Sequence, residues 1–449
     1  MVQRQFIPAG EPPGVGRKYL IPRLSGFMER EGLQSHFKLG ISFLLAACFT
    51  VLILPGSVHS QAEPVKVLYT GDPYPGQTPY IFMKVEPFLT VTPIQASRDY
   101  LWGFFTTADI RKAIRLYMPR NYDSLVENYD VLIISDSNVA SFSAEHLLWF
   151  QRAVAEDGRG LVMVGGHETF GTNGHHPDWG ETRVGDLLPV ETVYGGYESG
   201  RLEIFETDNE FMESLPWRDD LPFLRNYPSN MLRARPGAEV LARTTVTWDL
   251  VYDRKYLNWK NPFFSTWRYN GMGRVFSMAG DWTPGGGWQF MQWEYLPDFV
   301  ANLILYCDNR SIPADLNLVH TVRVRLSTLS YRRTIIISLV DFIETFGANP
   351  SNTLLAIGEV DEQRRVADRL YLDQEFAQAL ETAEMALDLM DEAEATAEKA
   401  KRGALLWVYV SEWLVVTATL LLCGFVVWSL MVRRRLYRDV SSTRLAGKR

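Results

Sequence analysis

Short apolar strands alternate with helical segments in the first half of this chain. The strand patterns lie at residues 65–69, 129–134 and 160–166, and the helical patterns lie around residues 109–114 and 143–157. Such alternation is typical of a parallel sheet covered by helices on both faces. The pattern predicts an α/β fold of flavodoxin or Rossmann type.

Strand patterns dominate from about residue 190 to residue 280, most clearly at 239–243 and 273–280. The last of them leads through a glycine-rich loop into an apolar helix at about residues 298–306. We expect this strand and helix to be the closing elements of the same domain. The predicted domain then spans residues 61–308.

The apolar period becomes helical beyond residue 308. Leu318, Val322, Leu326 and Leu329 recur at helical spacing in a segment that extends to residue 343, and Pro350 follows. A second pattern over residues 366–387 resembles one tetratricopeptide-like hairpin that turns near residues 373–374. A single hairpin cannot bury a core alone, so we expect it to pack on a neighbour or a partner. Residues 309–403 are predicted to form a helical stalk, which is either a solvated spacer or a docking site for a membrane protein.

Two apolar runs indicate a membrane protein. Residues 413–432 carry no charge and are followed by three arginines, which predicts a transmembrane helix within 404–432 and a cytoplasmic tail at 433–449. The run at 39–54 has the length of a signal-peptide core, so residues 39–60 form either a cleaved signal peptide or an N-terminal anchor. Residues 1–38 are predicted to be disordered. Because that stretch is basic, we expect residues 61–403 to lie outside the cytoplasm.

Charge and cysteine content exclude several classes of protein. The net charge is −8, but residues 1–38 carry +3 and residues 433–449 carry +6, so the segment between them carries −17. An acidic middle argues against nucleic-acid binding and agrees with basic ends at a bilayer surface. The three cysteines form no CxxC pair, which excludes a thiolate zinc site and a disulfide framework. The composition indicates no cofactor.

Polar residues follow the predicted parallel strands at the points where those strands end. Ligands of open parallel sheets bind beyond these carboxyl ends. We therefore expect a ligand-binding crevice for a small or carbohydrate-like molecule. Its predicted side chains are Asp72, Asp136, His167, Glu168, Thr169, Asp281 and Trp282. Trp282 and Trp288 are expected to lie exposed on the loop at this edge, where an indole can stack on a sugar ring.

The third strand and its continuation resemble a known family. The matching residues are the run from Val164 to Gly171 (VGGHETFG), Thr182, the run from Leu187 to Val190 (LLPV), the run from Gly273 to Val275, and Asp281. They are similar to the Gly-Gly-aromatic-x-Ser/Thr-Phe and Leu-Pro-Val signature of a glutamine amidotransferase family with the class I amidotransferase-like fold. The resemblance covers about residues 64–307.

The resemblance implies a fold but not glutamine hydrolysis. A class I glutaminase carries a nucleophilic cysteine where the strand turns into a helix. This chain has His167 and Glu168 there, and its sequence has no cysteine between Cys48 and Cys307. The loop after Asp281 also lacks the histidine of the family's partner pair. We therefore expect a binding or assembly module without glutaminase activity.

Two other functions stay open at this point. His167, His175, His176 and Asp178 lie within twelve residues, and imidazole with carboxylate suits Zn²⁺ or a related ion. The alternative prediction is thus a metal-assisted hydrolase that uses this loop. A third interpretation is a structural spacer within a larger envelope complex.

Overall fold

The computed structural model describes residues 63–73, 79–98, 105–171, 178–284, 286–346 and 349–446. The described residues all belong to the second of two units, Gln61–Arg449. The predicted disordered segment at 1–38 and the predicted signal peptide or anchor at 39–60 lie outside the described residues. Everything below concerns the second unit.

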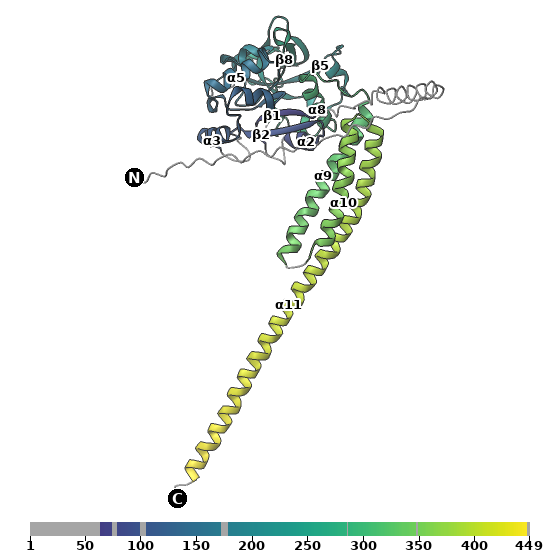
Figure 1. The fold of residues 1–449 in the computed structure, drawn as a ribbon. Coiled ribbons are helices and arrows are strands. Elements are labelled where there is room, and N and C mark those ends of the chain that lie inside the picture. Colours follow the sequence, from purple (N-terminus) through teal and green to yellow (C-terminus); the bar gives the residue numbers. More distant parts are fainter. Residues whose placement is uncertain are drawn as a thin grey trace, which may run out of the picture. The chain divides into compact units, whose positions relative to one another are not determined.

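Among the described residues of the α/β part, nine strands form one mixed sheet (Figure 1). Their bounds are β1 Val65–Gly71, β2 Leu89–Gln95, β3 Val131–Ser135, β4 Gly160–Val164, β5 Val190–Ile204, β6 Tyr227–Ala234, β7 Glu239–Thr245, β8 Lys260–Arg268 and β9 Arg274–Met278. The order is β2-β1-β3-β4-β9-β8-β7-β5-β6. The predicted α/β class is confirmed.

The sheet has a parallel half and an antiparallel half. Strands β2, β1, β3, β4 and β9 pair in parallel, whereas β8, β7, β5 and β6 pair antiparallel. The predicted strand after residue 273 is β9, which belongs to the same sheet and lies inside it between β4 and β8. The alternation of strands and helices did not predict β2, which is only partly buried at one edge of the sheet.

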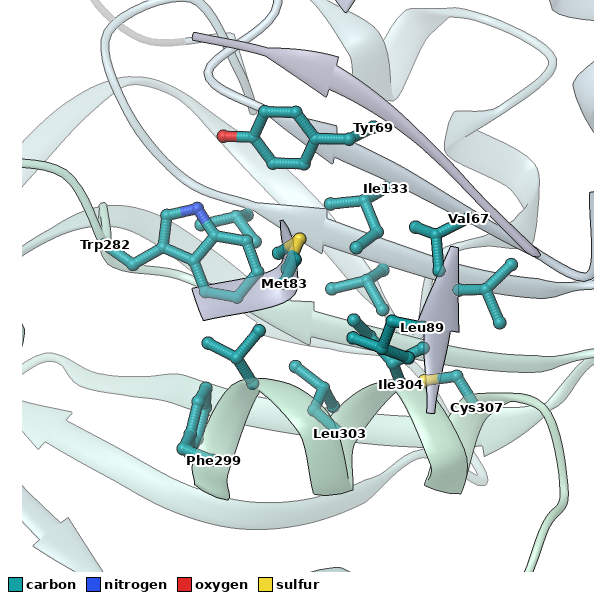
Figure 2. Close-up of a cluster of buried hydrophobic side chains, with 14 of the residues drawn as sticks. Val67, Tyr69, Met83, Leu89, Ile133, Trp282, Phe299, Leu303, Ile304 and Cys307 are labelled. Atoms are coloured by element: carbon teal, nitrogen blue, oxygen red, sulfur yellow. The ribbon is translucent and has the colours of Figure 1, made fainter. Parts of the chain in front are cut away.

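The α/β part also contains helices. Their bounds are α2 Tyr80–Val85, α3 Thr107–Tyr117, α4 Tyr122–Asn128, α5 Ala144–Ala155, α6 Glu210–Glu213, α7 Trp288–Met291 and α8 Leu296–Cys307. Strands β3 and β4 are buried along their whole lengths, as their apolar runs predict. Helix α8 is apolar on nearly every side, and its Leu303 and Ile304 pack beside Val67 and Ile133 of the sheet (Figure 2). The core therefore lies between the parallel strands and α8.

Three long helices follow, α9 Leu316–Thr345, α10 Ser351–Leu372 and α11 Phe376–Ala446. The predicted turn near residues 373–374 is confirmed, because α10 ends at Leu372 and α11 begins at Phe376. The predicted hairpin, which α10 and the first part of α11 form, packs on a neighbour within the chain, helix α9. Arg333 of α9 pairs with Asp361 of α10, and Arg332 of α9 pairs with Glu394 of α11.

The last helix is long and apolar enough to cross a membrane, and it is the one such helix among the described residues. Its apolar window is not covered by any other element of the structure. The predicted apolar run at 413–432 lies within this helix, and the basic residues at 433–446 continue it.

Candidate ligand site at the carboxyl edge of the parallel strands

Three aspartates from different parallel strands converge around one tyrosine. Asp72 follows β1, Asp136 follows β3 and Asp281 follows β9. Burial raises the pKa of Tyr69 far above its ordinary value, and the negative charges of Asp72, Asp281 and Asp136 raise it further. The Tyr69 hydroxyl therefore stays protonated, and it donates a hydrogen bond to the Asp72 carbonyl at 3.2 Å.

A second tyrosine joins His167 to the same carboxylates. The His167 and Tyr197 rings lie 5.3 Å apart, centroid to centroid. Burial of the Tyr197 hydroxyl raises its pKa, and Asp281 and Asp136 raise it further. A Cβ atom added to Gly286 would lie 2.9 Å from both the Tyr197 hydroxyl and the Asp281 Cβ, so this loop approaches the two side chains closely. His167 itself is exposed.

The turn after β4 is held by backbone conformation and by a distant asparagine. Gly166 has a φ of 151°, and a Cβ there would overlap the Asp136 carboxylate. Asn230 of β6 accepts a hydrogen bond from the Gly166 amide at 3.0 Å and donates to the Gly166 carbonyl at 3.1 Å. Asp136 accepts from the Glu168 amide at 2.6 Å. These bonds fix the direction in which His167 leaves the strand.

Glu168 and Thr169 are held by the scaffold. The buried Glu168 carboxylate pairs with the Arg98 guanidinium, and it accepts from the Arg98 amide at 3.0 Å and from the Asn138 side chain at 2.9 Å. Thr169 is fully buried, and its carbonyl accepts from Asn230 at 3.2 Å. Glu168 thus joins the segments that follow β2, β3 and β4. Its predicted role in ligand binding stays a prediction.

The expectation that Trp282 lies exposed at this edge is wrong. Its exposed fraction is 0%, and its indole donates to the Ser135 hydroxyl at 2.7 Å. Figure 2 shows it among the buried side chains above α8. The indole fills the core directly beneath the site, because Trp282 follows β9 in the middle of the sheet. Trp288, by contrast, is exposed.

The predicted metal loop is only partly described. His175 and His176 lie outside the described residues. Asp178 accepts hydrogen bonds from the Gly180 amide at 2.6 Å and the Thr192 hydroxyl at 2.7 Å, so it caps a short helical turn. Among the described residues, no three His, Cys, Asp or Glu side chains are grouped to hold a metal ion.

Cys307 lies at the opposite end of the sheet from the turn that carries His167. A Cβ added to Gly160, the first residue of β4, would lie 3.1 Å from the Cys307 Cβ. The turn follows the last residue of β4, about 16 Å farther along the strand. Burial also raises the pKa of the Cys307 thiol, which keeps it in the unreactive protonated form. The expectation that this cysteine is an inert core residue agrees with its surroundings.

Sequence reasoning missed the tyrosines and the asparagine that organise the site. Tyr69 carries a weak signal, since it lies three residues before Asp72 at the end of a strand. Tyr197 and Asn230 lie in the antiparallel half, and nothing in the pattern of residues 190–234 connects them to the turn after β4. Their roles depend on β5 and β6 belonging to the same sheet as β4 and β9.

Comparison with known proteins assigns no family to this chain. No family model and no curated protein matches it. Among solved structures, the cytoplasmic protein STM1381 from Salmonella typhimurium LT2 is 17% identical, covers 54% of this chain and 99% of its own, and has a TM-score of 0.39. The cytoplasmic protein STM3548 from Salmonella typhimurium is 16% identical with the same coverage and a TM-score of 0.37.

Proposed function

We propose that this protein is a membrane-tethered binding module of amidotransferase-like, flavodoxin-type fold that does not hydrolyse glutamine. The parallel strand order β2-β1-β3-β4-β9 supports the flavodoxin type, in which the sequential order 2-1-3-4-5 places ligands beyond the strand ends. The candidate spanning helix α11 supports the tether. The basic residues that follow the apolar run favour a cytoplasmic tail and an extracytoplasmic α/β part.

The observation that carries the proposal is the convergence of Asp136, Asp281 and His167 around Tyr197. Carboxylates accept hydrogen bonds from hydroxyl groups, and the protonated Tyr197 hydroxyl can donate one. An exposed imidazole ring above a tyrosine offers a flat face to a sugar ring. We therefore propose a carbohydrate-like ligand with several neighbouring hydroxyl groups.

Saturation-transfer NMR on the full-length protein in detergent, with a panel of neutral mono- and oligosaccharides, tests this function. We expect at least one sugar to bind, and Asp281→Asn to weaken its binding about 10-fold because a charged hydrogen-bond acceptor is lost. Asp308→Asn is the matched control, since Asp308 follows α8 and Cys307, at the amino end of β4.

Two results would contradict the proposal. The first is that no sugar binds, or that both aspartate variants bind it as the wild type does. The second is release of ammonia from glutamine well above background, because that reaction requires a nucleophile that we do not find at the turn after β4.

A further inference from the structure

The α9–α10 hairpin covers α11 only as far as Ala404. The exposed fraction is 1% at Ala404 and 64% at Leu406. Helices α9 and α11 run in parallel, because Arg325 pairs with Glu384 and Arg332 pairs with Asp391 and Glu394. In these pairs the α11 residue lies 59 to 62 positions later in the sequence than its α9 partner. Phe346, the residue that follows α9, therefore lies level with residues 405–408 of α11.

The end of the hairpin exposes large apolar side chains beside polar ones such as Glu344 and Asn349. Phe346 is exposed, and its ring lies 4.7 Å from that of Phe342. In the first turns of α10, Leu354 is exposed and Leu355 has an exposed fraction of 69%. We call Phe342, Phe346, Leu354 and Leu355 the hairpin tip.

The apolar run of α11 is longer than a hydrocarbon core requires. Residues 405–432 contain Glu412 as their one charged side chain, and these 28 residues extend about 42 Å as a helix. A bilayer with both headgroup layers is about 40–45 Å thick, of which about 30 Å is hydrocarbon. If residues 413–432 fill the hydrocarbon, each headgroup layer is about 5–8 Å deep, so residues 408–412 lie within the layer and residues 405–407 lie at its outer boundary.

The side chains at the start of the apolar run of α11 are of the kinds found near a headgroup layer. Trp407, Tyr409 and Trp413 are exposed there, and aromatic residues of this kind collect at membrane interfaces. Lys399, Lys401 and Arg402 are exposed just before the run begins.

We infer that the hairpin tip is a second membrane contact, at the outer boundary of the headgroup layer of the leaflet on the hairpin's side. This inference rests on the proposed membrane tether. The partner is the phospholipid interface itself, because the tip lies level with the stretch of α11 where that layer begins. Phe346 enters deepest, and Leu355 lies about 6 Å farther out along α10.

Nitroxide labels on the full-length protein in phosphatidylcholine vesicles test this contact. The background carries Cys48→Ser and Cys423→Ser and keeps the buried Cys307. Single labels go on Phe346→Cys, Leu355→Cys and Tyr331→Cys, and on Leu421→Cys within the apolar run. Tyr331 is the matched control, since it is an exposed aromatic residue of α9, with an exposed fraction of 68%, and lies about 22 Å before Phe346.

Electron paramagnetic resonance then compares collisions of each label with oxygen, which enters lipid, and with a water-soluble nickel chelate. We expect the oxygen-to-nickel ratio to be several-fold higher at position 346 than at 331, with 355 between them. Equal ratios at 346 and 331 overturn the inference. Dipolar broadening at 346 also overturns it, because a second copy of the chain would then cover the tip.

The label at position 421 separates this inference from the tether. If 421 is lipid-like and 346 is water-like, the membrane contact of the tip is wrong and the tether stands. If both positions are water-like, the tether fails and the contact fails with it.

Discussion

His146 illustrates how one side chain adds pH dependence to the fold. Its amide donates to the Ser143 hydroxyl at 3.2 Å, and its Nδ1 atom accepts from the Ser143 amide at 3.4 Å, which closes a capping box at the start of α5. Burial lowers the pKa of His146 below its ordinary value of 6.5. Both facts favour the neutral imidazole in the folded protein.

The sign of the pH effect follows from that lowered pKa. The unfolded chain binds this proton more readily than the folded one. The contribution of neutral His146 to the free energy of unfolding is therefore fully present above pH 6.5 and is lost as the pH drops toward the folded pKa. We expect His146→Gln to keep the cap and remove this part of the pH dependence, whereas His146→Ala loses about 1 kcal/mol at pH 8.

Urea unfolding at pH 8 and pH 5 measures both variants of His146. The wild type should lose more stability between the two values than His146→Gln does. An identical loss in the two proteins would show that the protonation of His146 is not linked to unfolding.

At the scale of elements, one buried arginine joins the helical part to the α/β part. Arg323 of α9 is almost fully buried and pairs with Glu86, after α2, at 2.9 Å and with Asp298 of α8 at 2.8 Å. It also donates to the Tyr371 hydroxyl of α10 at 2.8 Å. Burial alone would lower the pKa of Arg323, but Tyr371, Glu86 and Asp298 raise it above its ordinary value. Arg323 therefore stays charged and holds α8, α9 and α10 to one another.

Replacing Arg323 leaves the buried carboxylates of Glu86 and Asp298 without the guanidinium that pairs with them. We expect Arg323→Met to lower the free energy of unfolding by about 3–5 kcal/mol. Arg365→Met is the control, because the Arg365–Glu362 pair is solvent-exposed and contributes about 0–1 kcal/mol. Denaturant unfolding of the full chain in detergent compares them. Similar losses in both variants would mean that the buried cluster does not connect the two parts energetically.

At the scale of the whole molecule, α11 combines a soluble segment and an apolar segment in one helix. Small side chains, Ala379, Ala383, Ala386, Ala393 and Ala397, face the hairpin before Ala404 and are fully buried. Beyond that point large apolar side chains are exposed on all sides. A helix of this kind is stable in water over its first part and in lipid over its second.

Charged side chains in the apolar segment of α11 should prevent this helix from crossing the membrane. Arginine near the middle of a span costs about 3 kcal/mol each, so Leu421→Arg with Phe425→Arg opposes insertion by about 6 kcal/mol. A C-terminal epitope should be protected from protease added on the hairpin's side in the wild type and digested in this variant. Met385→Arg, in the soluble part of α11, serves as the control. Continued protection of the double variant would contradict a spanning α11.

The sequence by itself determined those features that depend on local period. Alternating strand and helix patterns predicted the α/β class, and helical spacing predicted α9. The turn near Asp373 and the apolar run of α11 were predicted from the sequence in the same way. These features were predictable because burial on one face imposes a period of 2 or 3.6 residues, whatever lies opposite. The same reasoning located Asp72, Asp136 and Asp281 at strand ends.

Only the tertiary structure decided what each strand-end side chain contacts. Trp282 is buried because it lies against Ser135, 147 residues earlier in the chain. Glu168 is engaged because Arg98 and Asn138 come from other loops. Tyr197 reaches His167 only because the antiparallel half joins the sheet at β9. Partners so distant in sequence leave no periodic trace, since their proximity depends on strand order and not on the spacing of residues along the chain.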